Sequence, residues 1–325
     1  MQTSFADLEY AARKKRTRRD IFLDELERLA PWAALEQAIR PFYPESGLPG
    51  RPPIGLCRML RMYLAQQCFG LSDEATEDAV YDSHAIRRFV GVDLGRERVP
   101  DATTLLHFRH LLEAHALTES LFQVINTHLA ERGLFLRQGT IVDATLIAAP
   151  PSTRNATGQR DPEMHQSKKG KQWYFGMKAH IGVDADSGLV HTVIGTAGNI
   201  SDVSQAAALL HGDEIVAYGD AGYQGVAKRP EHLETPVEWQ TAMRPGKRRA
   251  LTDADEAVEQ QERLKASIRA KVEHPFHVVK NLFRHRKTRY RGLAKNTAQL
   301  LTLFGLANLL LAKRWLLPER ARVAS

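Results

Sequence analysis

The first third of the chain has apolar residues that recur every three or four positions, the spacing typical of amphipathic helices. Residues 20–132 are therefore predicted to be all-helical, with short turns. The expected helices are one or two between Ile21 and Ile39, then Ile54–Phe69, one from Ser72-Asp73, one from Asp101 and Thr118–Arg132. Such a region is compatible with a helix-turn-helix-like DNA-binding unit, although most small helical domains bind no DNA.

After Gly139 the pattern changes to short apolar runs, which predict strands. The expected strands are Thr140–Ala148, Tyr174–Val183, Leu189–Thr196, Glu214–Asp220 and Val237–Met243. Residues 151–172 are polar and predict a long loop, and helices are expected at 201–210, from about Asp253, and at Leu300–Leu317. This order indicates an α/β fold, an RNase H-like domain with a mixed sheet and helices on its faces. The predicted domains are a basic arm (1–19), a helical DNA-binding domain (20–135) and the RNase H-like catalytic domain (136–320).

The charge of the chain is concentrated in one segment. Residues 269–295 hold nine Lys or Arg and one acid, Glu273, a net +8, so subtracting it from the chain's +7 leaves about −1 elsewhere. A second basic run, Arg13–Arg19, lies in the N-terminal arm. Clustered cations and a pI near 9.4 indicate a polyanionic partner. Two cysteines provide neither a disulfide framework nor a zinc cysteine set, and no signal core or membrane-length apolar run is present, so a cytoplasmic protein is expected.

On a helix, the basic segment would present one acid among a row of cations. At 100° per residue, a set of side chains falls within about 60°: Arg269, Glu273, Lys280, Arg284 and Lys287. The alternative is a solvated basic face in which Glu273 pairs with Arg269 at i,i+4. Pro275 should kink or restart the helix, and a kink just after Glu273 would let the acid face a different direction from Lys280.

Three carboxylates stand out because of their positions. Asp143 lies mid-strand among apolar residues, where an unpaired charge is costly. Asp220 ends a second apolar strand, at the sheet edge where open α/β folds bind ligands. With Glu273 from a flanking helix, they would form an oxygen-rich site for Mg²⁺ or Mn²⁺. Each acid taken alone is more simply a structural hydrogen-bonding residue.

Several motifs resemble the DDE transposases of bacterial insertion sequences, in particular the "insertion sequence 5" family. They are Ile141-Val-Asp-Ala-Thr, Asp161-Pro-Glu-Met-His, Trp173-Tyr-Phe-Gly-Met-Lys-Ala-His180, Tyr218-Gly-Asp-Ala-Gly-Tyr223 and Arg269…Glu273-His-Pro-Phe…Lys280. The resemblance covers nearly the whole chain. It departs from the family signature at Ala266, where the signature has Tyr. Only 52 residues separate Asp220 from Glu273, which leaves no room for a large β-rich insertion.

The resemblance implies that Asp143, Asp220 and Glu273 are the catalytic acids and hold two Mg²⁺ or Mn²⁺ ions. It implies a transposase that binds the terminal inverted repeats of its element, cleaves the ends and transfers them to target DNA. A homodimer or larger synaptic oligomer is expected because two ends must be joined, and a nucleoid-associated bacterial location would follow. Alternatives are an RNase H-like nuclease without strand transfer and a non-catalytic DNA-end-binding regulator.

The expected contacts to double-stranded DNA are basic side chains near these acids. They are Arg269, Lys280, Arg284, Lys287, Arg289 and Arg291, with Lys178 and His180 as further candidates. Lys178 and His180 share one face of a strand and are as well explained as a satisfied structural pair. A zinc site built from His165, His180 and His191 is not expected, because these residues lack ligand spacing and lie in different elements.

Overall fold

The computed structural model of the chain describes residues 15–44, 52–156, 158–232 and 237–317. The chain divides into two compact units. The first is formed by residues up to 125 together with those from 312 onward, and the second by residues 126–311. Two long helices, α8 (Leu117–Ala130) and α12 (Leu293–Leu316), each contribute residues to both units.

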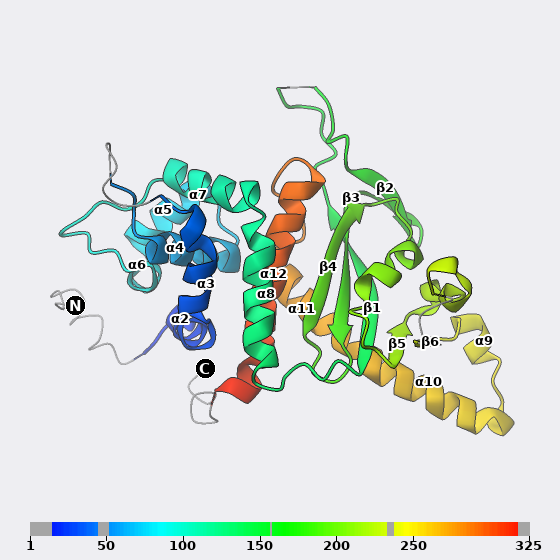
Figure 1. The fold of residues 1–325 in the computed structure, drawn as a ribbon. Helices are drawn as coiled ribbons and strands as arrows, with labels where there is room; N and C mark the ends of the chain where they lie inside the picture. The colour runs from blue at the N-terminus through cyan, green and yellow to red at the C-terminus, as the bar shows by residue number, and fades with distance from the viewer. Residues whose placement is uncertain (1–14, 45–51, 157, 233–236, 318–325) are drawn as a thin grey trace. The chain divides into compact units, whose positions relative to one another are not determined.

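The first unit is built of short helices, as the apolar periodicity predicted (Figure 1). Besides α8 and the end of α12, its helices are α2 (Arg18–Leu29), α3 (Trp32–Ile39), α4 (Leu56–Phe69), α5 (Asp73–Asp82), α6 (His84–Val90) and α7 (Ala102–Ala114), with a 3₁₀ turn, η1 (Arg40–Phe42). The side chains of Ser72 and Asp101 cap α5 and α7, and Gly91 ends α6 in the left-handed conformation that glycine adopts without strain. Of the predicted arm, residues 1–14 lie outside the described residues, and Arg18 and Arg19 belong to α2.

The second unit contains a six-stranded mixed sheet. Its strands are β1 (Gly139–Ala148), β2 (His165–Lys169), β3 (Gln172–Asp184), β4 (Val190–Ala197), β5 (Val216–Gly219) and β6 (Glu238–Thr241). The long strand β3 pairs antiparallel with β1 on one side and with β2 and β4 on the other. Beyond β1 lie β5 and β6, both parallel to their neighbours. Three antiparallel strands, β4-β3-β1, extended by two parallel ones, form the predicted RNase H-like α/β sheet.

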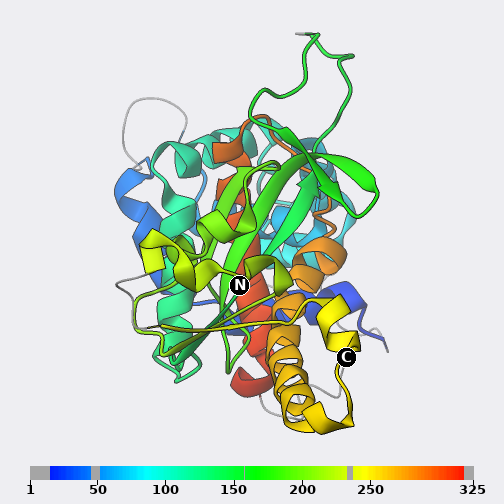
Figure 2. The ribbon, with the colours of Figure 1, turned by 90° about the vertical axis from the view of Figure 1, so that its right-hand side faces the viewer.

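Both faces of this sheet are covered by apolar residues. On one face Val142 of β1 packs with Ala206, Leu209, Tyr223 and Val226 from the turns that flank β5. The other face contacts α12, where β4 comes close to the helix at Gly195: a Cβ added there would lie 2.0 Å from Thr297 Oγ1. The described part of the connection from β1 to β2 projects away from the sheet in both ribbon views (Figures 1 and 2).

The structure differs from the predicted elements at several places. Residues 165–169 form the strand β2, although their polar sequence predicted a loop, because an edge strand needs no apolar face to pair with β3. The helix expected at 201–210 is two 3₁₀ turns, η2 (Asp202–Gln205) and η3 (Ala207–Leu209). The closing helix begins earlier than expected, at Leu293 rather than Leu300.

The charged segment that carries Glu273 is a series of helical pieces. It runs from α10 (Glu256–Arg269) through a 3₁₀ turn, η8 (Ala270–Val272), and α11 (Glu273–His277) to a π-helical turn, η9 (Val278–Leu282). Pro275 lies in the first turn of α11, where its missing N–H has no intrahelical partner to lose. Irregular turns thus lie on both sides of Pro275, one before Glu273 and one after the proline.

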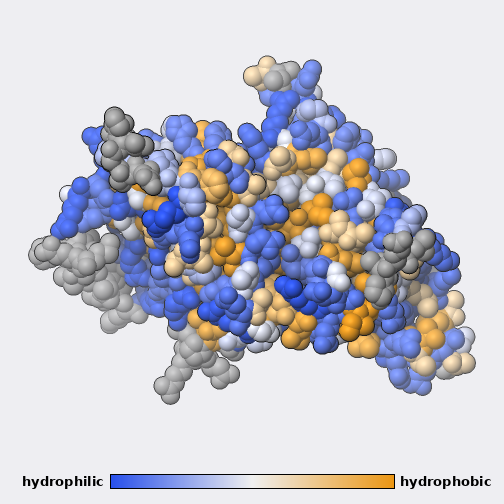
Figure 3. All heavy atoms as spheres, in the orientation of Figure 1, coloured by the Kyte–Doolittle hydropathy of each residue, from blue (hydrophilic) through white to orange (hydrophobic). Residues whose placement is uncertain are grey.

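None of the described helices is long and apolar enough to cross a membrane. In the view of Figure 3, hydrophilic residues lie among the apolar ones over both units.

Candidate active site

Asp143 lies in the middle of the central strand β1. Ile141 and Val142 before it are fully buried, and the antiparallel register places Asp143 opposite Ile181 of β3. On the other side β1 pairs in parallel with β5, with Ile141 level with Tyr218. Two residues further along each strand lie Asp143 and Asp220. The sheet register therefore places these two acids side by side.

Asp220 follows the last residue of β5 and begins the 3₁₀ turn η4 (Ala221–Tyr223). Its Oδ1 accepts a hydrogen bond from the backbone N–H of Gly222 at 2.8 Å. This bond fixes the carboxylate at the carboxyl end of the strand. A Cβ at position 222 would lie 2.9 Å from the same oxygen, so a larger residue there would displace the carboxylate.

Glu273 is the first residue of α11, and its side chain is exposed. The preceding turn η8 packs against β1, and α10 packs against β5. The helix segment is thus anchored on the two strands that carry the aspartates. Arg269, the last residue of α10, is half-buried beside them.

The electrostatics of Asp143 confirm that these charged groups are near one another. Burial, together with the negative charges of Asp220 and Glu273, raises the pKa of Asp143 to about 7. The Ala144 N–H, which donates to Asp143 Oδ1 at 2.7 Å, and the Arg269 guanidinium oppose this rise in pKa. Three carboxylates near a single guanidinium leave an excess of negative charge. Such an oxygen-rich, negatively charged group fits divalent-cation binding.

The three acids do not converge on a single point. Among the described residues, one group of His, Cys, Asp or Glu side chains has three ligand atoms all within 4.8 Å of one another, and it is not this one.

Lys280, in the π-helical turn, contacts β1 directly. Its Nζ donates to Thr145 Oγ1 at 2.7 Å and to the Leu146 carbonyl at 2.9 Å. The ammonium is thus held beside the strand of Asp143, and its contacts fasten the helical segment to the sheet. Whether it also contacts DNA stays a prediction.

The basic residues after Lys280 lie where β1 ends. Ala148 forms a parallel bridge with Lys287, in which the Thr288 N–H donates to the Ala148 carbonyl at 2.9 Å. The side chains of the predicted DNA contacts in this segment are exposed: Arg284, Lys287, Arg289 and Arg291. The sheet therefore fixes the backbone of the basic segment and leaves its cations on the surface.

Lys178 and His180 of β3 both face Asp202. Lys178 Nζ donates to Asp202 Oδ1 at 2.9 Å and to the Ile200 carbonyl at 2.7 Å. His180 is fully buried, its Nε2 is 2.7 Å from Thr196 Oγ1, and burial lowers its pKa to about 4. These contacts match the structural alternative. A DNA contact by the His180 ring would require the ring to become exposed, and this contact stays an untested prediction.

Tyr223 is a residue near the acids to which the sequence reasoning gave no role beyond the motif. The ring is buried, and its hydroxyl has no hydrogen-bond partner in the described part of the chain. Its pKa is raised by burial and by the charges of Asp143, Asp202 and Asp220, so the hydroxyl stays protonated beside the carboxylates. The Tyr-Gly-Asp-Ala-Gly-Tyr motif was the available signal, but its spacing does not reveal where the ring points.

Comparison with protein families agrees with this arrangement. Residues 134–309 match the family model described as "Transposase DDE domain", and residues 11–111 match "Transposase domain (DUF772)". No solved structure matches the chain. The first model spans more than half of the chain and the whole sheet with its acids, so the chain belongs to the DDE-type transposases of insertion sequences.

Proposed function

We propose that this transposase binds the terminal inverted repeats of its own insertion sequence and catalyses cleavage and strand transfer at Asp143, Asp220 and Glu273. The assignment to the "insertion sequence 5" family is part of this proposal. The observation that carries it is the parallel pairing of Ile141 with Tyr218, two residues before Asp143 and Asp220, together with the raised pKa of Asp143, to which the charges of Asp220 and Glu273 contribute. Carboxylates with perturbed pKa values are a recurrent feature of active sites.

The same three acids are proposed to hold two Mg²⁺ or Mn²⁺ ions. When bound, such ions polarise the scissile phosphate and lower the pKa of the attacking water or 3′-hydroxyl. Asp143 and Asp220 have little freedom to move, because strand pairing and the Ala144 and Gly222 N–H groups fix them. Glu273 is exposed at the start of α11, on a segment that packs against both strands.

The neighbouring cations would orient the substrate. Arg269 lies close enough to Asp143 to lower its pKa, so its guanidinium can also reach a phosphate at the acids. The exposed cations from Arg284 to Arg291 would hold the backbone of duplex DNA beyond the end of β1. Two DNA ends must be processed together, so a homodimer or larger synapse is proposed as the working assembly.

The test is a strand-transfer assay with the purified full-length protein, DNA carrying the element's own ends, target DNA and Mg²⁺. The wild type should cleave the ends and join a pre-cut 3′-hydroxyl end to the target. Asp143→Asn and Asp220→Asn should each lower both activities by ~10³-fold or more, as expected for groups acting in the transition state. Glu238→Gln, at an exposed position on the edge strand β6, is the matched control and should stay active.

The outcomes also separate the alternatives. Cleavage without joining would identify a nuclease, and binding to the ends without either reaction would identify a regulator. Cleavage that survives in Asp143→Asn would refute the assignment of the metal-binding acids.

A further inference from the structure

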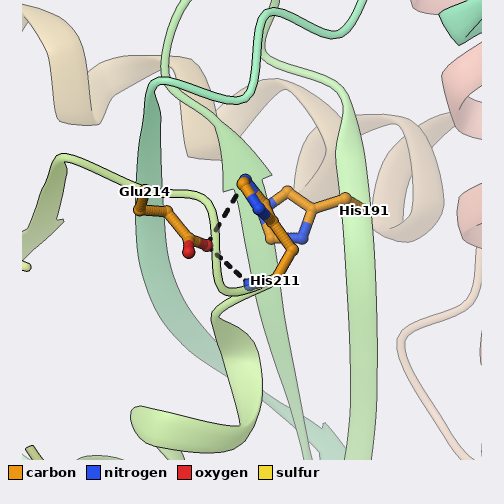
Figure 4. A group of neighbouring side chains, drawn as sticks. All are labelled: His191, His211 and Glu214. Carbon is orange, nitrogen blue, oxygen red and sulfur yellow. Dashed lines mark hydrogen bonds and ion pairs between the residues drawn. The ribbon is translucent and has the colours of Figure 1, made fainter. Parts of the chain in front are cut away.

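A second cluster of metal-binding residue types lies away from the three acids. His191 is in β4, and His211 and Glu214 are in the short connection from η3 to β5 (Figure 4). One ligand atom from each of these side chains lies within 4.8 Å of the others. The neighbouring residue on β1 is Thr140, three positions before Asp143, which corresponds to about 10 Å along a strand.

We propose that His191, His211 and Glu214 bind one transition-metal ion of the zinc class, at a site separate from the catalytic acids. Two imidazoles and one carboxylate suit Zn²⁺ and its neighbours in the first transition row, whereas Mg²⁺ prefers oxygen ligands alone. Three protein ligands leave a fourth position for water.

The distances are near those that a zinc ion requires. Bonds of about 2.1 Å to a tetrahedral ion place neighbouring ligand atoms about 3.4 Å apart. His211 Nε2 and Glu214 Oε1 are already 3.4 Å apart (Figure 4). The three ligand atoms all lie within 4.8 Å of one another. Side-chain movements of about 1 Å would bring them to the spacing that a tetrahedral ion requires.

The sheet makes room for the His191 imidazole. A Cβ at Gly182, on the neighbouring strand β3, would lie 2.6 Å from His191 Cε1 and 2.4 Å from the Leu209 carbonyl. The strand pairing is irregular between Gly182 and Val183, next to His191. The glycine and the irregular pairing together let the ring lie across the sheet towards the connection that carries the other two ligands.

Hydrogen bonds orient the proposed ligands. His191 Nδ1 is 2.9 Å from Thr192 Oγ1 and its Nε2 is 3.0 Å from Thr140 Oγ1, whose hydroxyl donates to Glu214 Oε1 at 2.9 Å. The ring nitrogen that binds the ion would exchange its threonine contact for the metal, and the other nitrogen would keep its contact. The backbone N–H groups of His211 and Gly212 also donate to the Glu214 carboxylate. Metal ligands are commonly oriented by such bonds.

The competing explanation is a purely structural network, in which Thr140 bridges His191 and Glu214 and no ion binds.

Zinc titration of the metal-free, full-length protein separates these explanations. Excess Mg²⁺ is kept present to occupy the catalytic acids, and bound Zn²⁺ per chain is measured by equilibrium dialysis. We expect one tightly bound Zn²⁺ per chain and a thermal midpoint that rises with Zn²⁺ concentration. Thr140→Val, which removes the hydroxyl that contacts both His191 and Glu214, should weaken binding roughly 10–100-fold.

Variants of the proposed zinc ligands distinguish a metal site from a purely structural network. His211→Ala and Glu214→Gln should weaken Zn²⁺ binding more than Thr140→Val does, and they should change the visible spectrum of bound Co²⁺. Asp143→Asn and His107→Ala, the latter at an exposed position on α7, should bind Zn²⁺ as the wild type does. If His211→Ala fails to fold by circular dichroism, Glu214→Gln, which keeps the side-chain shape, decides alone.

Two outcomes would overturn the proposal. One is wild-type Zn²⁺ affinity in a folded ligand variant. The other is loss of Zn²⁺ binding in Asp143→Asn alone, which would place the zinc at the catalytic acids.

Discussion

Asp143 combines two requirements that conflict in a protein without bound metal. The strand that fixes its position also shields it from water, and the other two acids of the proposed site, Asp220 and Glu273, repel its charge. The free energy lost in holding such a carboxylate ionised is recovered when a cation binds, because the cation offsets both the lost hydration and the repulsion. A residue that is unfavourable in the metal-free fold is thereby suited to binding metal.

Stability of the metal-free protein should depend on the ionisation of Asp143. Its pKa is about 7 in the folded chain and near its ordinary value, about 3.9, when unfolded. The folded state therefore binds the proton more tightly, and the resulting stabilisation is full below pH 4 and lost as pH rises through 7. Asp143→Asn should thus gain stability relative to wild type between pH 5 and 8, by up to about 4 kcal/mol.

The stability difference between Asp143→Asn and the wild type is measured by urea unfolding in the presence of a metal chelator, at pH 5 and at pH 8. Added Mg²⁺ should stabilise the wild type at pH 8 and leave Asp143→Asn nearly unchanged. A stability difference that does not vary with pH would mean that Asp143 titrates near its ordinary pKa.

At the scale of elements, the sheet comes close to a helix at Gly195 of β4 in the second unit. A Cβ there would meet Thr297 Oγ1 at 2.0 Å and Met177 Cε at 3.0 Å. Gly195→Ala should therefore destabilise the protein by about 1–3 kcal/mol through overpacking. Adding Thr297→Ala removes the nearest atom and should restore part of this loss, a coupling visible in a double-mutant cycle of urea unfolding. Additive effects would show that β4 and α12 are not packed this closely.

Lys280 offers a second test at this scale. Lys280→Met would leave Thr145 Oγ1 and the Leu146 carbonyl without this donor and should cost about 1–3 kcal/mol of stability. Thr145→Val should cost less, and the two changes should be coupled because they remove the same hydrogen bond. Unchanged stability together with a weaker affinity for DNA would instead assign Lys280 to DNA contact alone.

The helices and strands also show how much of the fold could be predicted from the sequence. Apolar periodicity predicted the helices of the first unit and most of the strands, because burial on one face is recorded in the spacing of apolar residues. It missed β2, whose polar residues form an edge strand. It also placed Arg284 and Lys287 on the helix of Glu273, whereas the helical turns end at Leu282 and Arg284 has a positive φ of 59°. The pairing of β1 with β5, which brings Asp143 beside Asp220, depends on long-range contacts that periodicity does not encode.

The same limit explains why the sequence did not indicate the cluster of His191, His211 and Glu214. A zinc set of His165, His180 and His191 was rejected on spacing, but the fold brings His191 of β4 beside His211 and Glu214 of the connection to β5. The register of β3 and β4 is irregular next to His191, and no local sequence pattern indicates this irregularity.

At the scale of the whole molecule, the position of the positive charge determines how DNA binding should depend on salt. The +8 of residues 269–295 exceeds the net charge of the chain, so DNA binding through this segment should be strongly salt-dependent. Each exposed cation that contacts a phosphate adds about 0.9 to the slope of log affinity against log salt concentration. Arg284→Gln and Lys287→Gln should therefore each lower that slope by about 0.9 for duplex DNA carrying the element's ends.

Arg263→Gln is the control, because this exposed arginine on α10 already pairs with Glu259 at 3.0 Å. The slope measured for this variant should equal that of the wild type. Fluorescence anisotropy at several salt concentrations gives the slopes, and equal slopes in all three variants would place the DNA on another surface.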